Sequence, residues 1–327
     1  MAQAEGSVTH SSHEAIPSES YTDLVSKLPT REGWSQPLVL YKNYWIRPHV
    51  AENIMRLQSS FKARNEDTIL ATSPKCGTTW LKALAFAITN RSQYDFDDHH
   101  PLLFRHPQEV VPFIEITLGK DLNYVETLPS PRILATHMPV SLLPESFVGC
   151  GCQFVYMCRD PKDVFVSWWY YDNKIRRGHK INLEDAFNMF CEGVSPMGSF
   201  WDHCLEYWRE STIRPNKILF LKYEEVMSEP VKCVKRLAAF LGVPFTIKEE
   251  EEEIPEKVVR LCSFEKLSGL QVNQMGHINR RENIVFEKSA YFRRGKVGDW
   301  VNHMSEEMGR KLDYITEKKL EDSGLML

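Results

Sequence analysis

Four short apolar runs, each followed by a helical pattern, constrain the fold of this chain more than any other feature. The runs cover residues 68–72, 132–136, 152–157 and 217–221. Continuous apolar runs of this length are typical of strands that are covered on both faces. Helical spacing covers residues 78–89, 163–172, 183–192, 199–209 and 230–241. The alternation predicts an α/β fold with a central, mainly parallel sheet flanked by helices.

Composition and charge limit the class of protein. The chain has 327 residues, of which 43% are apolar, and a formal net charge of −4. We expect a disordered polar tail over residues 1–20 and a single domain over residues 21–327. The charge balance argues against a nucleic-acid partner. Residues 249–253 are five glutamates in a row, which predicts a solvated linker.

Targeting signals are missing from the sequence pattern. The N-terminal segment lacks the apolar core of a signal peptide, and no run of 18 apolar residues occurs. The eight cysteines form no C-x-x-C pair. We therefore expect a cytoplasmic protein with reduced thiols, no membrane partner and no metal site.

The loop after the first apolar run carries the clearest chemical signal. Residues 72–80 read T-S-P-K-C-G-T-T-W, between an expected strand and an expected helix. A helix N-terminus presents free N–H groups and the positive end of the helix dipole, which bind anions. Gly77 lets the backbone approach a phosphate closely, and Lys75 adds a mobile charge. Because the lysine precedes the only glycine, this P-loop-like site is not the G-x-x-x-x-G-K-[ST] motif.

Two further segments bring cations to helix or loop positions. Arg159 follows the third apolar run, and Ser167 lies eight residues later in the next helical pattern. Arginine can hold a phosphate in a bidentate fork, although Arg159 could instead pair with Asp160 or Asp163. Residues 293–300 read R-R-G-K-V-G-D-W, which alone is also compatible with a basic surface loop.

His137 follows the second apolar run. The carboxyl end of a parallel strand is where ligands bind in such sheets, so a histidine there is a candidate general base. A single histidine at such a position is more often structural.

Taken together, these motifs resemble the cytosolic sulfotransferase family, most of all its soluble plant members of the flavonol and steroid type. The similarity runs from about residue 40 onward. It implies that the donor is 3′-phosphoadenosine 5′-phosphosulfate (PAPS), that no metal is needed, and that the partner is a small hydroxylated acceptor. The donor-binding residues that it implies are Lys75, Cys76, Gly77, Thr78, Thr79, Trp80, Arg159, Ser167, Tyr223, Ser263, Phe264, Arg293, Arg294 and Gly295.

The resemblance also implies catalytic roles. His137 would take the proton of the acceptor hydroxyl, and Lys75 would stabilise charge on the bridging oxygen during in-line displacement at sulfur. Animal relatives often carry a lysine two residues before the histidine. This chain has Ala135 there, as plant relatives commonly do, and Arg294 replaces a lysine of the family pattern.

Aromatic residues are expected to form the acceptor pocket. The candidates are Phe104, Phe113, Trp168 and Tyr171. An apolar pocket with one histidine suits a flavonoid, a steroid, a phenolic compound or a hydroxyjasmonate. Family members often dimerise through a short segment after G-D-W, and residues 301–307 match that pattern poorly. The resemblance therefore leaves a monomer or a weak homodimer open.

Two other functions compete with this interpretation. An ATP-dependent kinase would need no 3′-phosphate site, and a nucleotide sensor would bind without transfer. Arg159, Ser167, Arg293 and Arg294 have no purpose for ATP, which favours the sulfotransferase.

Overall fold

A computed structural model describes residues 20–117, 122–147, 149–178, 180–281 and 284–327. The expected disordered tail lies outside these residues, apart from Ser20. That serine is the N-cap of α1 (Tyr21–Ser26), where its hydroxyl accepts a 3.1 Å hydrogen bond from the backbone N–H of Asp23.

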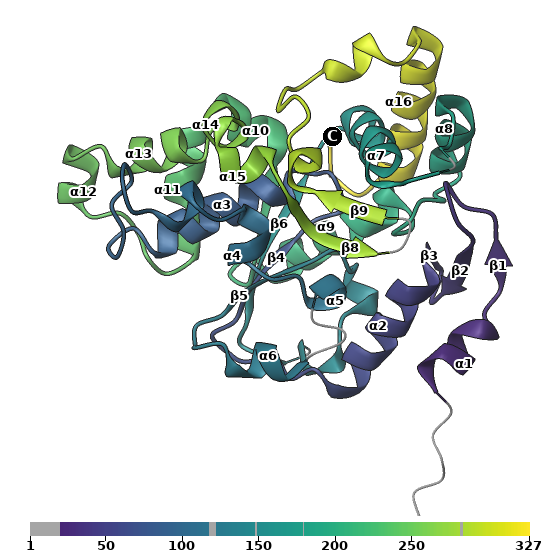
Figure 1. Cartoon of the computed structure of the whole chain (residues 1–327), viewed down its shortest axis with the longest axis horizontal. Coiled ribbons are helices and arrows are strands. Elements are labelled where there is room, and N and C mark those ends of the chain that lie inside the picture. The colour runs from purple at the N-terminus through teal and green to yellow at the C-terminus, as the bar shows by residue number, and fades with distance from the viewer. Residues whose placement is uncertain (1–19, 118–121, 148, 179, 282–283) are drawn as a thin grey trace, which may run out of the picture.

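A four-stranded parallel sheet lies at the centre of the molecule (Figure 1). Its strands are β4 (Thr68–Ala71), β5 (Ile133–Thr136), β6 (Gln153–Cys158) and β7 (Ile218–Lys222). Their order is β5-β4-β6-β7, and Ile69 pairs with both Leu134 and Phe154. The four predicted strands are thus confirmed to within one or two residues at each end.

Both faces of this sheet are buried, which explains why its strands are apolar throughout. Ile69 and Ala71 belong to the core formed with α2 (Pro48–Ser60), α7 (Pro161–Ile175) and α9 (Phe200–Ile213). Leu70 belongs to the opposite core, formed with α3 (Thr78–Thr89), α11 (Pro230–Phe240) and α13 (Ile254–Leu261). Successive strand residues point to opposite faces, so each needs an apolar side chain.

Smaller elements surround this framework. A three-stranded antiparallel sheet is formed by β1 (Thr30–Arg31), β2 (Leu38–Tyr41) and β3 (Tyr44–Ile46), and a hairpin by β8 (His277–Arg281) and β9 (Ile284–Glu287). The other α-helices are α4 (Pro107–Val110), α5 (Ile114–Thr117), α6 (Leu122–Thr127), α8 (Leu183–Cys191), α10 (Tyr223–Ser228), α12 (Ile247–Glu251), α14 (Phe264–Gly269), α15 (Gln271–Gln274) and α16 (Glu306–Leu320).

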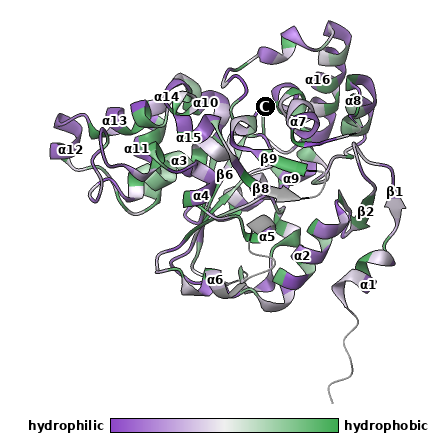
Figure 2. Ribbon diagram, viewed as in Figure 1, coloured by the Kyte–Doolittle hydropathy of each residue, from purple (hydrophilic) through white to green (hydrophobic). Residues whose placement is uncertain are grey.

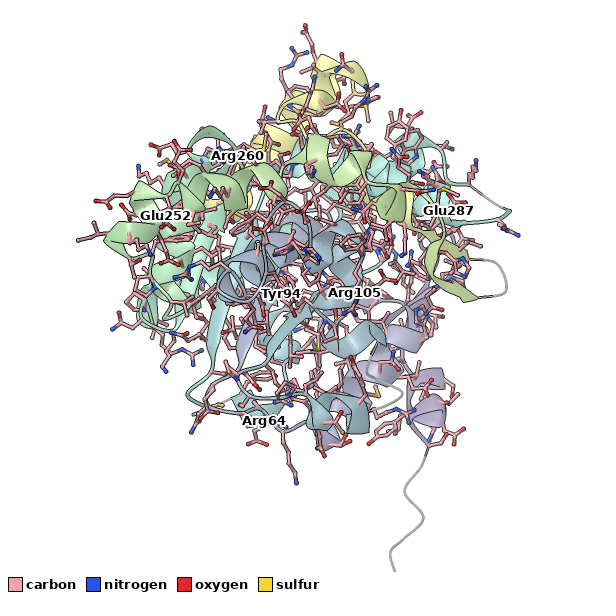
Figure 3. The ribbon with its side chains drawn as sticks, turned by 60° about the vertical axis from the view of Figure 1, so that its left-hand side comes forward. Arg64, Tyr94, Arg105, Glu252, Arg260 and Glu287 are labelled. Atoms are coloured by element: carbon pink, nitrogen blue, oxygen red, sulfur yellow. The ribbon has the colours of Figure 1, made fainter. Side chains whose placement is uncertain are left out.

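The outer helices separate polar from apolar residues. Along α2 and α16 the ribbon alternates between hydrophilic and hydrophobic residues (Figure 2), and charged side chains such as Glu252 and Arg260 lie at the periphery (Figure 3). Within the described ranges, no helix combines the length and apolarity needed to cross a membrane. All eight cysteines are free thiols, and six of them are buried.

The glutamate run is largely exposed, as predicted for a solvated segment, but part of it is helical rather than a linker. Ile247–Glu251 forms α12, whose N-cap Thr246 makes a reciprocal capping box with Glu249. Glu249 also forms an ion pair with Arg91, 2.6 Å between Oε1 and Nε.

Candidate active site

The turn between β4 and α3 is shaped by Gly77. This residue is the N-cap of α3 and has φ 93° and ψ 20°, a left-handed conformation that glycine adopts without a steric penalty. A Cβ at this position would lie 2.7 Å from Cε of Met157 and 2.8 Å from Cδ2 of Tyr223. Glycine therefore allows the loop to pack directly on β6 and α10, with the helix N-terminus at the edge of the sheet.

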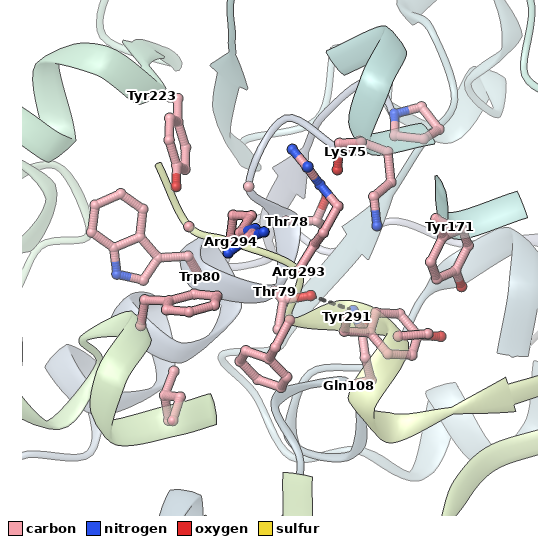
Figure 4. A pocket seen from close by; sticks show the side chains of 18 of the residues that line it. Lys75, Thr78, Thr79, Trp80, Gln108, Tyr171, Tyr223, Tyr291, Arg293 and Arg294 are labelled. Carbon is pink, nitrogen blue, oxygen red and sulfur yellow. Dashed lines mark hydrogen bonds between the residues drawn. The ribbon is translucent and has the colours of Figure 1, made fainter. Parts of the chain in front are cut away.

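One cavity of about 500 Å³ opens at this helix N-terminus (Figure 4). It brings together residues that the sequence analysis placed on seven separate segments. The predicted residues in its lining are Lys75, Gly77, Thr78, Thr79, Trp80, Phe113, His137, Arg159, Ser167, Trp168, Tyr171, Tyr223, Ser263, Phe264, Arg293, Arg294 and Gly295.

Two predicted residues are not part of this lining. The side chain of Cys76 is fully buried, with its Sγ 4.0 Å from the carbonyl oxygen of Pro74, so it faces the core rather than the cavity. Phe104 ends a 3-10 turn (Pro101–Leu103) and is 65% exposed to solvent. Phe104 therefore does not line this cavity, because the turn directs it outward, and its contact with the acceptor stays a prediction.

Lys75 is half-buried where several positive charges meet. Its Nζ lies 3.9 Å from the ring centroid of Tyr171, a favourable cation–π contact. Burial, assisted by the charges of Arg159 and Arg293, lowers the pKa of Lys75 to about 7. The chain as a whole is acidic, so this local concentration of positive charge points to a site for an anion.

Arg159 and Asp163 connect the start of α7 to the basic segment at 293–300. One Arg159 nitrogen donates to Asp163 at 3.1 Å and to the carbonyl oxygen of Lys296 at 2.8 Å. The same buried carboxylate accepts hydrogen bonds from the backbone N–H groups of Gly298 and Trp300. Arg159 thus makes the ion pair considered above and still reaches the cavity. Its buried Nε has no hydrogen-bond partner among the described residues, which fits a ligand oxygen.

The segment around Gly295 closes the cavity from the other side. A Cβ on Gly295, which has φ 63°, would lie 2.3 Å from Cδ2 of Phe264. Only glycine can lie so close to that ring. Arg293 forms an ion pair with Asp299, and its charge also faces the ring of Tyr170 at 5.4 Å.

Aromatic rings adjoin the cations. The rings of Trp80 and Tyr223 meet edge to face with centroids 5.4 Å apart, and the guanidinium of Arg159 lies 4.6 Å from the Tyr223 ring centroid. Flat apolar surface next to a phosphate loop suits a heteroaromatic base carrying phosphate groups.

His137 is held in a defined orientation at the end of β5. Its Nδ1 lies 2.8 Å from the carbonyl oxygen of Thr72, and its ring lies 4.6 Å from the Phe113 ring. A carbonyl oxygen only accepts, so Nδ1 carries the ring hydrogen and Nε2 keeps its lone pair. Burial lowers the pKa of His137 to about 3, which keeps the imidazole neutral.

Several lining residues were missed by the sequence analysis. Tyr291 and Phe292 directly precede the basic segment at 293–300, so their closeness to that motif was a usable signal. Gln108 lies on α4 and Lys174 on α7, and neither belongs to a recognisable motif. Within the described residues, no three side chains of the His, Cys, Asp or Glu types gather closely enough to hold a metal ion.

An α/β sheet with a phosphate loop, several cations and adjoining aromatic rings suits an enzyme that binds a phosphorylated nucleotide. Comparison with known families specifies the class. The sulfotransferase domain model matches residues 65–324, and the chain belongs to this family.

Relatives and solved structures agree with this assignment. The chain is 42% identical to cytosolic sulfotransferase 16 of Arabidopsis thaliana (94% of this chain, 92% of the relative). It is also 42% identical to flavonol 4′-sulfotransferase of Flaveria chlorifolia (94% and 97%). The predicted resemblance to plant sulfotransferases is confirmed.

Two crystal structures extend the comparison to the fold. One is a putative steroid sulphotransferase of Arabidopsis thaliana, with a TM-score of 0.74 and 36% identity over 93% of this chain and 94% of that one. The other is a mouse sulfotransferase complexed with PAP, with a TM-score of 0.67 and 25% identity over 88% and 96%. The predicted fold class is confirmed.

Proposed function

We propose that this sulfotransferase moves the sulfuryl group of PAPS to the hydroxyl of a small apolar acceptor, with His137 as the general base. The observation that carries the proposal is the placement of His137 and the 72–80 loop on one cavity. A base and an anion site within one pocket can hold the two reactants in contact.

The donor side of the proposal rests on the cations. PAP, 3′-phosphoadenosine 5′-phosphate, is the nucleotide that remains when PAPS loses its sulfuryl group, and the mouse relative was solved with it. In this chain we assign the 5′ end to Lys75, Thr78 and Thr79 at the start of α3. We assign the 3′-phosphate to Arg159, Ser167 and the segment 293–295, and the adenine to Trp80 and Tyr223.

Sulfuryl transfer requires removal of the acceptor's proton and stabilisation of the charge on the departing oxygen. Nε2 of His137 takes the proton of the acceptor hydroxyl as the new oxygen–sulfur bond forms. The sulfur–oxygen bond of the donor breaks at the same centre, and the charge on the departing oxygen is stabilised by Lys75. The ion pairs and backbone hydrogen bonds around Asp163 hold the cations in place before binding, which reduces reorganisation.

The acceptor is assigned to the aromatic part of the cavity. Phe113, Trp168 and Tyr171 line the same cavity as His137, and Tyr291 lies 5.5 Å from Tyr171, centroid to centroid. Flat surfaces of this kind suit a flavonoid, a steroid, a phenolic compound or a hydroxyjasmonate. A plant relative named for a flavonol makes the flavonoids the first class to test.

The test combines binding and transfer. Thermal unfolding is measured with PAP, ADP and ATP, because a ligand that binds the folded state raises its stability. Mass spectrometry then follows sulfation of a panel from the four acceptor classes with PAPS as donor. We expect stabilisation by PAP above that by ADP or ATP, and sulfated product with at least one class. Equal or greater stabilisation by ATP would contradict the proposed donor and favour a kinase.

A further inference from the structure

Lys82 is a buried lysine beside the cavity that the proposed reaction does not use. It lies on α3, and its side chain has no exposed surface. Burying an ammonium group is costly unless partners compensate for the lost water. Among the described residues, no carboxylate forms an ion pair with Lys82. Its partners are the Gln108 carboxamide, 2.5 Å from Nζ to Oε1, and the Phe113 ring, 3.4 Å from Nζ to the centroid.

The hydrogen bonds that start at Lys82 all donate toward the cavity. An amino group that donates to Oε1 of Gln108 fixes which end of the carboxamide faces it, because only the oxygen accepts. Nε2 of Gln108 then points the other way and donates to Oγ1 of Thr79 at 3.0 Å, the dashed bond in Figure 4. Thr79 accepts that bond, so its own hydroxyl hydrogen is available to another acceptor.

Thr79 is the point at which this chain of donors reaches the cavity. Gln108 and Thr79 line the cavity, whereas Lys82 lies behind them. Thr79 belongs to the first turn of α3, next to the backbone N–H groups that point at the same space. Each bond runs from Lys82 toward the cavity, and polarised hydrogen bonds in series strengthen one another.

We propose that Lys82 is a positioning residue, which acts through Gln108 to present the Thr79 hydroxyl as a hydrogen-bond donor to the 5′-phosphosulfate end of the donor. The inference rests on the proposed function, since it needs a phosphorylated ligand at the start of α3. It assigns a role to two residues, Lys82 and Gln108, that no motif identifies. Burial lowers the pKa of Lys82 well below its ordinary value, and the amine donates to Gln108 in either protonation state.

The experiment is a double-mutant cycle on PAP binding, measured by titration calorimetry. The variants are Lys82→Met, Thr79→Val and the double variant. Lys82→Met keeps the length and the burial of the side chain and removes the donor. We expect each single variant to bind PAP about tenfold more weakly, a typical value for one charge-assisted hydrogen bond. The double variant should bind no more weakly than Thr79→Val, because the same interaction is already lost.

Two controls separate this role from a structural one. Thr89→Val removes a hydroxyl from the far end of the same helix, where Thr89 donates to the carbonyl oxygen of Ala85 at 2.9 Å. This variant should bind PAP like the wild type. Lys82→Met should weaken PAP binding by the same factor with and without Thr89→Val. Adenosine 3′-monophosphate, which lacks the 5′ group, should bind equally to wild type and Lys82→Met.

The outcomes are distinguishable. If the wild type does not bind PAP, the proposed function fails. If PAP binds but Lys82→Met does not change its affinity, the proposed role of Lys82 is contradicted. The same holds if Lys82→Met weakens PAP binding equally with and without the Thr79 hydroxyl. Should Lys82→Met fail to fold, Gln108→Leu interrupts the same chain at a half-buried position and must lower PAP affinity about tenfold, with no further loss when combined with Thr79→Val.

Discussion

The backbone N–H of His137 donates a 2.7 Å hydrogen bond to Oε1 of Glu115, while the other oxygen of this buried carboxylate accepts from the hydroxyl of Thr136 at 2.9 Å. Glu115 lies on α5, so this bond couples a neighbouring helix to the end of β5. The proposed base is therefore fixed through its backbone as well as through its ring.

Glu115→Gln should destabilise the protein and slow transfer. The amide oxygen can still accept from the His137 N–H, but the Thr136 hydroxyl must turn to accept from the NH₂ group, and the loss of two hydrogen bonds to a charged acceptor costs roughly 1–3 kcal/mol. We expect that loss in urea unfolding at pH 7.5, together with a lower kcat and nearly unchanged PAP affinity. Glu317→Gln, on the exposed face of α16, is the matched control and should change neither quantity. A Glu115→Gln enzyme with wild-type stability would contradict this account.

His137→Asn should remove the base without removing the donor site. General base catalysis contributes about 10²–10⁴-fold, so kcat should fall within that range. PAP affinity should stay within about twofold, because His137 makes no assigned donor contact. Since the pKa of His137 is about 3, kcat/KM for the acceptor should show no acidic limb near pH 6.5. An acidic limb there that disappears in His137→Asn would mean that the imidazole titrates near pH 6.5 and not near 3.

Binding of PAP should take up a proton at Lys75. With a pKa of about 7 in the free protein, Lys75 is largely neutral at pH 8. A bound anion favours the charged form and raises that pKa, so uptake should approach about one proton at pH 8. Calorimetry at pH 8 in buffers with different ionisation enthalpies measures the number of protons taken up on binding. Lys75→Met should reduce it to near zero, and an equal uptake in that variant would assign the proton elsewhere.

Acid should destabilise the free protein through its buried histidines. Burial lowers the pKa of His137 to about 3 and of His203 to about 4. The unfolded chain binds protons near pH 6.5 and the folded one does not, so this stability is complete above pH 6.5 and is lost as the pH falls toward 3–4. Each fully buried ring should remove about 1 kcal/mol at pH 5.5 relative to pH 7.5.

Urea midpoints across that pH range provide the measurement. His203→Gln keeps a donor for the carbonyl oxygen of His137 and should reduce the pH dependence by about 1 kcal/mol. If the free energy of unfolding depends on pH as in the wild type, the pKa of His203 does not differ between the folded and unfolded states.

Arg294→Met should change nucleotide preference. Arg294 lines the cavity near the assigned 3′-phosphate position, and loss of one guanidinium–phosphate contact should weaken PAP binding about 10- to 100-fold. ADP has no 3′-phosphate and should bind as before. Arg310→Met, on exposed α16, serves as the control for removal of an arginine. Equal losses for PAP and ADP would contradict the assigned position.

The central sheet and most of the cavity could be predicted because the signals are local. Ile69 and Leu70 lie in a run that is apolar on both faces, and Gly77 follows a lysine at a strand-to-helix turn. These patterns depend on backbone chemistry within a few residues. The same is true of Pro230 at the start of α11.

The rest depended on contacts between distant residues. Gln108 gains its role from Lys82 and Thr79, which lie 26 and 29 positions away along the chain. Glu249 pairs with Arg91, which is 158 positions away along the chain, and this contact could not be read from the glutamate run alone. Phe104 is aromatic and near the expected pocket in sequence, yet a turn three residues long decides which way it faces.

The cavity lining is drawn from segments spread between residues 74 and 295, from Lys75 through Arg159 and Tyr223 to Gly295. During translation, a nascent chain that has not yet exposed residues 293–300 holds the phosphate loop without its opposing arginines and without the backbone donors for Asp163. By the proposed assignment, nucleotide should therefore bind such an intermediate more weakly than the folded chain, and should stabilise it less by mass action.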